Sequence, residues 1–234
     1  MAMTFEEALA YIRETSANES EKGKRFEQAT RYFFMNDPLW SPRLSETWAW
    51  ADAPTNDGQD IGIDLVAQDA EDGSYWAIQC KAYDDAATLD YKTLSTFFST
   101  AAASNQYKNL AIVDTAADWS SNLQKIADQY KTIRINQQDL SASSIDWQPF
   151  IEGKASTQRA VYEPRPHQVE AIDACVAGFH EHDRGQLIMA CGTGKTLTAL
   201  RLAEKMYPEG SFVLFMAPSI SLVAQTLREW ANQA

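Results

Sequence analysis

The stretch from Asp60 to Lys81 constrains the fold of this chain more than any other. Two short apolar runs, residues 61–66 and 75–78, lie on either side of a turn-like segment at residues 70–74. Short apolar runs bounded by turn residues are typical of paired, buried strands. The stretch therefore predicts a β-hairpin, and polar residues at its ends are candidates for a functional site.

Three polar side chains would meet at one end of this hairpin. Gln79 and Lys81 are two residues apart and point to the same face of a strand, and strand pairing would bring Asp64 beside them. A carboxylate and an amide oxygen can hold a hard divalent cation, while a nearby lysine can orient or deprotonate a water that attacks phosphorus. Asp60 would share the face of Asp64 in a strand and could widen the metal site; a solvated loop acid fits it nearly as well.

These residues resemble the PD-(D/E)xK nucleases, and specifically their Mrr-like branch, in which glutamine replaces the first acid of the second motif. Gln79-Cys80-Lys81 matches that motif, Gly62-Ile63-Asp64 matches the G-I-D element, and residues 23–27, GKRFE, match the first helix. The resemblance implies a restriction-endonuclease-like fold, with a central mixed sheet flanked by helices. It also implies a Mg²⁺-dependent catalytic set of Asp64, Gln79, Lys81 and Glu27. Without the resemblance, Glu27 reads as a surface acid, Asp64 as a turn acid and Lys81 as a solvated strand end.

The elements around the hairpin indicate an α/β layer arrangement. A capping box of Thr4 and Glu7 predicts a first helix to about Thr15. The polar residues 16–24 predict a connector to a second helix, which carries Glu27 and ends at Asp37-Pro38. Further expected elements are strands at 46–50, 109–114 and 132–135, and helices at 91–103 and 120–129.

A different module is expected to follow. Residues 151–161 have the small and polar composition of a linker between a nuclease-like domain at 1–150 and a second domain at 162–234. In the second domain, Met189–Thr196 (MACGTGKT) follows an apolar pair at 187–188, expected to end a strand, and precedes a helical run at 197–206. Strand, glycine loop and helix form the context of a phosphate cradle. A plain strand-to-helix turn is the alternative, because Met189 stands where a Walker A loop has its first glycine.

Each residue of the loop has an expected role toward ATP. Main-chain N–H groups of Gly192, Thr193 and Gly194 favour anionic phosphate, Lys195 would reach the terminal phosphates, and Thr196 would hold magnesium. The loop resembles those of superfamily 2 helicases and translocases, whose first RecA-like lobe the second domain would begin.

Two neighbouring segments agree with that resemblance. Residues 165–168 (RPHQ) resemble the Q-motif, in which Gln168 would read adenine. Residues 213–215 are expected to form a strand, and residues 217–225 resemble motif Ia, which contacts the DNA backbone. Neither a DExx box nor a second lobe precedes Ala234, so we expect a fragment of a longer protein that binds nucleotide poorly and does not translocate.

The charge and the apolar pattern indicate how strongly the chain binds DNA and where in the cell it is located. Residues 1–150 hold 12 Lys and Arg against 23 Asp and Glu, a difference of −11 within a total of −12. Because DNA contacts normally need basic surface, the first domain is expected to hold DNA weakly by itself. No signal peptide and no apolar run of about 18 residues is visible, and the three cysteines are widely spaced. We therefore expect a cytoplasmic protein that has reduced thiols and does not bind membranes.

A nuclease of this type placed directly before a motor resembles the N-terminal part of type ISP, single-polypeptide restriction-modification enzymes. The stretches TWAWADAP, DIGIDLVA, YWAIQCKAYD and AIVDTAADWS carry this resemblance. It implies cleavage of double-stranded DNA, driven by an ATP-dependent translocase and guided by methyltransferase and target-recognition domains of the same polypeptide. Two alternatives remain: a repair-type or modification-dependent nuclease-helicase, and a catalytically inactive DNA-binding or regulatory domain on a superfamily 2 motor.

Overall fold

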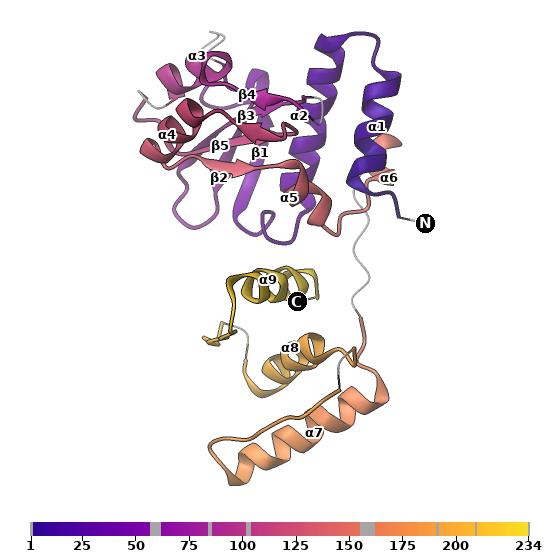
Figure 1. The fold of residues 1–234 in the computed structure, drawn as a ribbon. Coiled ribbons are helices and arrows are strands. Elements are labelled where there is room, and N and C mark those ends of the chain that lie inside the picture. Colours follow the sequence, from indigo (N-terminus) through magenta and orange to yellow (C-terminus); the bar gives the residue numbers. More distant parts are fainter. Residues whose placement is uncertain are drawn as a thin grey trace. The chain divides into compact units, whose positions relative to one another are not determined.

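The computed structural model describes residues 2–56, 62–83, 86–101, 104–154, 162–190, 192–208 and 210–233. The chain divides into two compact units, Met1–Thr157 and Gln158–Ala234, which we describe separately (Figure 1). In the described part of the chain, no helix combines the length and the apolar character that a membrane crossing needs.

The first unit is built on a mixed five-stranded sheet. Its strand order is β1-β2-β3-β5-β7, with β1 Leu44–Ala49, β2 Leu65–Asp69, β3 Tyr75–Lys81, β5 Tyr107–Asp114 and β7 Ile133–Ile135. The pairs β1–β2 and β2–β3 are antiparallel, whereas β3–β5 and β5–β7 are parallel. The direction of pairing therefore changes at β3. A separate parallel pair joins β4 Thr88–Leu89 to β6 Asp118–Trp119.

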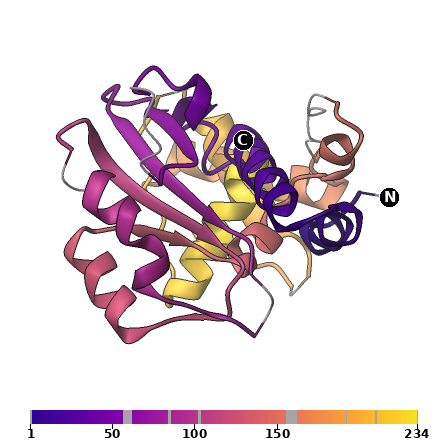
Figure 2. The same cartoon turned by 90° about the horizontal axis from the view of Figure 1, so that it is seen from above.

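Helices cover both faces of this sheet, as the two views in Figures 1 and 2 show. The helices of the first unit are α1 Phe5–Thr15, α2 Glu19–Asn36, α3 Tyr91–Ala101, α4 Ser121–Gln129, α5 Gln137–Ala142 and α6 Gln148–Ile151, with a 3-10 turn η1 at Trp50–Asp52. One buried cluster joins α1 and α2 to the sheet through residues such as Ile12, Phe26 and Trp76. The other joins α3 and α4 to the opposite face through Phe97 and Leu123. The predicted central mixed sheet flanked by helices is confirmed.

The predicted hairpin is present, but its first strand begins later than expected. β2 and β3 pair with Leu65 opposite Ile78, and the turn lies at residues 70–74 as predicted. β2 begins at Leu65, and Gly62 before it has a φ of 70°, which lies outside the extended region. A Cβ at Gly62 would also lie 3.1 Å from the main-chain nitrogen of Phe97. Glycine therefore allows α3 to approach the start of the hairpin closely.

The predicted connector at residues 16–24 is wrong, because α2 already begins at Glu19. Asn18 caps the helix by accepting a hydrogen bond from the main-chain nitrogen of Glu21 (3.0 Å), and Lys22 pairs with Glu19 one turn away (2.6 Å). These polar residues form a solvated first turn rather than a loop. The first helix begins at Phe5 with the capping box of Thr4 and Glu7 that the sequence predicts.

The second unit contains α7 Pro166–Glu181, α8 Lys195–Met206 and α9 Ile220–Gln233. The strands predicted at 187–188 and 213–215 are absent, and no strand forms among the described residues of this unit. Ile188 is 83% exposed and Leu214 is 69% exposed. A strand needs a neighbour to pair its main-chain N–H and C=O groups, and none of the described segments supplies one.

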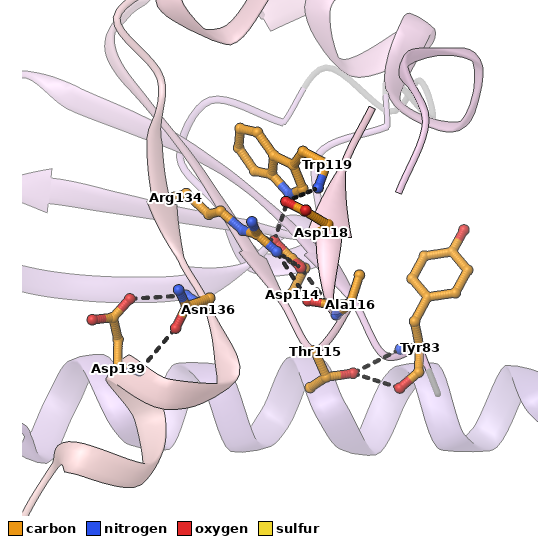
Figure 3. A network of polar contacts seen from close by, with 9 residues as sticks. All are labelled: Tyr83, Asp114, Thr115, Ala116, Asp118, Trp119, Arg134, Asn136 and Asp139. Atoms are coloured by element: carbon orange, nitrogen blue, oxygen red, sulfur yellow. Dashed lines mark hydrogen bonds and ion pairs between the residues drawn. The ribbon is translucent and has the colours of Figure 1, made fainter. Parts of the chain in front are cut away.

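A buried ion pair holds the carboxyl ends of β5 and β7 together (Figure 3). Asp114 is fully buried and accepts hydrogen bonds from Arg134 Nε (3.0 Å) and Nη2 (2.9 Å), and from the indole nitrogen of Trp119 (2.9 Å). The main-chain nitrogen of Ala116 donates to the same carboxylate at 3.0 Å. Every one of these donors lies in the loops and strands that follow β3 in the chain.

Replacing Asp114 with Asn should lower the free energy of unfolding by about 3 kcal/mol, because it leaves the Arg134 guanidinium without its buried counter-ion. The loss is measured from urea unfolding followed by tryptophan fluorescence, since six of the seven tryptophans lie in the first unit. Asp72→Asn, at the exposed ion pair with Lys108, is the control and should leave the midpoint unchanged. Equal effects of the two substitutions would contradict the assignment.

Candidate active site

Asp64 and Gln79 meet where the hairpin ends. Asp64 directly precedes β2, and its main-chain nitrogen donates to the carbonyl oxygen of Ile78 at 3.0 Å. This places Asp64 opposite Gln79, whose amide nitrogen donates to Asp64 Oδ2. The main-chain nitrogen of Cys80 donates to the same oxygen at 2.7 Å. The hairpin therefore holds the Asp64 carboxylate with two donors from β3.

Glu27 reaches this site from α2. The pKa of Glu27 is raised to about 7, mainly by burial and also by the negative charge of Asp64, while the charges of Lys81 and Lys24 act in the opposite direction. The charges of Asp64 and Lys81 therefore both act on the Glu27 carboxyl group. The four predicted catalytic residues thus lie on α2 (Glu27), directly before β2 (Asp64) and at the end of β3 (Gln79 and Lys81).

Cys80 lies between Gln79 and Lys81 but on the other face of β3, in the cluster beneath α1 and α2. It is 6% exposed, and burial, followed by the charge of Asp64, raises the pKa of its thiol well above the ordinary value. The thiol therefore stays protonated at neutral pH. Cys80 therefore has a packing role in the cluster under α1 and α2. It does not act as a nucleophile at the site.

The oxygen donors at the site fit a hard divalent cation. Mg²⁺ is typically held by one or two carboxylates, with water and substrate phosphate oxygens completing its shell. Asp64 and Glu27 supply two carboxylates in a half-buried site. The described residues contain no group of three His, Cys, Asp or Glu side chains that could hold a metal ion. Asp60, the third predicted acid, lies outside the described residues.

Gln79 presents its amide nitrogen, not its oxygen, to Asp64. The oxygen of a planar amide points away from the group that its nitrogen contacts, so a shared ion would require rotation of the Gln79 amide. Gln79 is 3% exposed, so water does not compete for its contact with Asp64. Its contact with Asp64 supports a role in orienting that carboxylate more directly than the predicted role as a metal ligand.

The glycine loop of the second unit curls around its lysine. Gly192 and Gly194 have φ angles of 77° and 79°, which favour glycine, and α8 begins at Lys195. Lys195 Nζ donates to the carbonyl oxygen of Ala190 at 3.0 Å, and the Thr193 hydroxyl donates to the same oxygen at 2.7 Å. The lysine ammonium thus lies inside the loop, where the sequence expects terminal phosphates.

Gln168 ties the start of α7 to this loop. Its amide nitrogen donates to the carbonyl oxygens of Thr193 and Gly194, both at 3.2 Å, and its amide oxygen accepts from the main-chain nitrogen of Arg165 at 2.8 Å. A Cβ at Gly194 would lie only 2.5 Å from the Gln168 amide nitrogen, so this contact needs glycine. To bind adenine, the Gln168 amide would have to exchange these hydrogen bonds for bonds to the base.

Two residues that contact predicted site residues were not predicted from the sequence. The main-chain nitrogen of Thr115 donates to the carbonyl oxygen of Lys81 at 3.1 Å, and the indole nitrogen of Trp230 donates to that of Thr196 at 3.0 Å. Thr115 directly follows an apolar strand, and that position is the only signal the sequence offers. Trp230 lies in a helical run with no distinguishing motif.

Both units match known protein families. Residues 35–157 match the sequence family described as "Restriction endonuclease", and residues 161–234 match "Type III restriction enzyme, res subunit". The structure resembles that of the ATP-dependent Type ISP restriction-modification enzyme LlaBIII bound to DNA, with a TM-score of 0.82 and 31% identity. That match covers 99% of this chain but 15% of the LlaBIII chain.

A curated relative matches over a shorter stretch. UvrABC system protein B of Kosmotoga olearia is 36% identical over 75 residues, which are 32% of this chain and 11% of that protein. This chain therefore spans a small part of the length of each relative.

The pKa of Glu27 predicts how stability depends on pH without metal. Because the folded protein binds this proton more tightly than the unfolded chain, the free energy of unfolding should fall as pH rises from about 4.5 to 7. Glu27→Gln removes this loss and should be more stable than the parent at pH 8 by roughly 1–2 kcal/mol, after allowance for partial solvation.

Urea unfolding between pH 5 and 8 in a chelating buffer measures the effect of Glu27→Gln. Glu46→Gln, at an exposed position on β1, is the matched control and should follow the parent curve. If the free energy of unfolding of Glu27→Gln changes with pH in the same way as that of the parent, Glu27 is not buried beside Asp64 as described.

Gln79→Glu should place a second carboxylate against Asp64. Repulsion between the two carboxylates should lower the melting temperature at pH 8 without metal, and Mg²⁺ should raise it by more than in the parent. Differential scanning fluorimetry with and without Mg²⁺ measures both shifts. Gln106→Glu, at an exposed position, controls for added charge. An equal Mg²⁺ effect in both variants would argue that residue 79 does not face the ion.

Proposed function

The chain belongs to the restriction endonuclease family, and from this premise we propose that its first unit carries a Mg²⁺-dependent phosphodiesterase site for double-stranded DNA. The observation that carries the proposal is the contact of Asp64 with Gln79 at the end of the hairpin, together with the influence of Asp64 and Lys81 on the pKa of Glu27. Two acids, an amide and an ammonium group in one half-buried site match what phosphodiester hydrolysis needs. The presence of this combination argues against an inactive DNA-binding domain.

Each residue has a distinct role in the proposed reaction. When bound, Mg²⁺ polarises the phosphate and lowers the pKa of a coordinated water. Asp64 would hold the ion, Glu27 would contribute a second carboxylate, and Gln79 would orient Asp64 through its amide nitrogen. Lys81 orients the attacking water and balances negative charge as it develops on the phosphate. Asp60 remains a candidate for a further ligand.

The second unit supports a proposal of its own, an ATP site. Gly192, Thr193 and Gly194 would cradle the phosphates, Lys195 would exchange its contacts with Met189 and Ala190 for the terminal phosphates, and Thr196 would hold the nucleotide's magnesium. Gln168 would read adenine after exchanging its own contacts. The match of residues 161–234 to a type III restriction enzyme subunit supports a helicase-type motor.

We further propose that the chain acts within a longer, cytoplasmic polypeptide resembling a type ISP restriction-modification enzyme. The similarity to LlaBIII, which is described as ATP-dependent and bound to DNA, supports this setting. In it, ATP-driven translocation delivers the nuclease to DNA, and methyltransferase and target-recognition domains choose the site. The acidic charge of residues 1–150 agrees with a nuclease that holds DNA weakly by itself.

A repair-type or modification-dependent nuclease-helicase is the second candidate. The relative in Kosmotoga olearia, named as part of the UvrABC system, favours it. The two functions differ in what they cut, since a restriction enzyme spares DNA methylated at its own site whereas a modification-dependent nuclease requires modified DNA. Cleavage of matched methylated and unmethylated plasmids separates them.

The nuclease site and the ATP site can be tested separately, by one substitution in each, in the polypeptide that contains this chain. Asp64→Ala should abolish DNA cleavage and leave DNA-stimulated ATP hydrolysis unchanged, because only the nuclease site loses its central ligand. Lys195→Ala should abolish ATP hydrolysis. Plasmid cleavage and phosphate release are the measurements.

Asp72→Ala is the matched control, since Asp72 lies in the exposed turn of the same hairpin and should affect neither activity. The folding of Asp64→Ala is checked by circular dichroism, because it leaves the main-chain nitrogen of Cys80 without an acceptor. Retained cleavage by Asp64→Ala would reject the proposed site.

A further inference from the structure

We propose that Thr115 is a positioning residue for Lys81: its hydroxyl extends the β3–β5 pairing past the end of the sheet and thereby fixes the ammonium group at the cleavage site. The inference rests on the proposed nuclease function. Lys81 is the last residue of β3, opposite Asp114 at the end of β5. A side chain at a strand end moves with its main chain, and strand ends fray unless something holds them.

Thr115 holds the chain on both sides of this end. Its main-chain nitrogen donates to the carbonyl oxygen of Lys81 at 3.1 Å. Its hydroxyl accepts from the main-chain nitrogen of Tyr83 at 2.8 Å and donates to the carbonyl oxygen of Tyr83 at 2.7 Å (Figure 3). The hydroxyl therefore uses both its donor and its acceptor capacity on one residue. Together the three bonds fix residues 81–83 after regular pairing has ended.

Thr115 is itself rigid, because its two neighbours are anchored. Asp114 before it is bound by Arg134 and Trp119, and Ala116 after it donates to Asp114 (3.0 Å) and accepts from Arg134 Nη2 (2.9 Å). Figure 3 shows these contacts together with the Thr115–Tyr83 bonds. Thr115 is 1% exposed, so water does not compete for its hydroxyl. The corner that holds Lys81 is thus part of the buried frame of the first unit.

The residues around Thr115 also determine which carboxylates are available to the Lys81 ammonium group. Partners in parallel strands point to the same face, so Asp114 is the carboxylate that would compete for the Lys81 ammonium. Arg134 occupies both oxygens of Asp114. Lys81 is therefore left to act on Asp64 and Glu27, in agreement with its influence on the pKa of Glu27. Position and electrostatics both depend on the residues around Thr115.

Thr115→Val, which keeps the shape and removes the hydroxyl, tests the proposal in the DNA-cleaving polypeptide that contains this chain. The single-turnover cleavage rate at saturating DNA and Mg²⁺ should fall roughly tenfold to a hundredfold, because a small misplacement of a catalytic group is costly. DNA affinity and ATP hydrolysis should not change. Thr115→Ser retains the hydroxyl and should restore the rate, which a loss of packing alone would not predict.

Arg13 Nη2 also donates to the carbonyl oxygen of Tyr83, at 2.7 Å, which helps Thr115→Val to fold. If that variant does not fold, Thr115→Cys replaces it, and its weakly hydrogen-bonding thiol should also slow cleavage. Parental cleavage by the folded variant, or equally slow cleavage by Thr115→Ser, overturns the inference.

Lys81→Ala separates this inference from the proposed function. If Lys81→Ala cleaves DNA at the parental rate, the proposed catalytic site is wrong. If Lys81→Ala is inactive while Thr115→Val cleaves normally, the site stands and only the role of Thr115 is rejected.

Discussion

The site depends on one register, the antiparallel pairing of β2 with β3. Because Leu65 lies opposite Ile78, Asp64 falls beside Gln79 and receives the main-chain N–H of Cys80. A slip of one residue would turn these side chains to opposite faces and separate the carboxylate from its donors. The register is held by packing, since Leu65, Val66, Ala77 and Ile78 are almost fully buried. The apolar residues of the hairpin thus determine where its polar residues meet.

The change from antiparallel to parallel pairing at β3 gives this strand two kinds of neighbour. β2 brings Asp64 to its end from one side, while β5, running parallel, brings Asp114 and Thr115 to the same end from the other. A purely antiparallel meander would place the start of the next strand beside Lys81 instead. The mixed sheet therefore lets a buried ion pair and an acidic site flank the same lysine.

Much of the first unit was predictable because its signals are local. Capping at Thr4, the apolar runs of the hairpin and the spacing of Gln79 and Lys81 depend only on nearby residues. The start of α2 was missed because polar residues such as Lys22 suit a solvated helix turn as well as a loop. Thr115 was missed because its partners, Lys81 and Tyr83, are more than 30 residues away. In the second unit, apolar residues indicated strands, but strands form only where a neighbour pairs with them.

Electrostatics gives the cation a role before any chemistry occurs. The negative charge of Asp64 adds to burial in raising the pKa of Glu27 to about 7, against the opposing charges of Lys81 and Lys24, so at higher pH two neighbouring carboxylates are ionised. A DNA phosphate is also negative and would be repelled from such a site. A divalent cation reverses this balance, because it favours the ionised form of Glu27 and attracts the phosphate at the same place. In the proposed enzyme, a bound cation would therefore help the substrate phosphate to approach as well as support its cleavage.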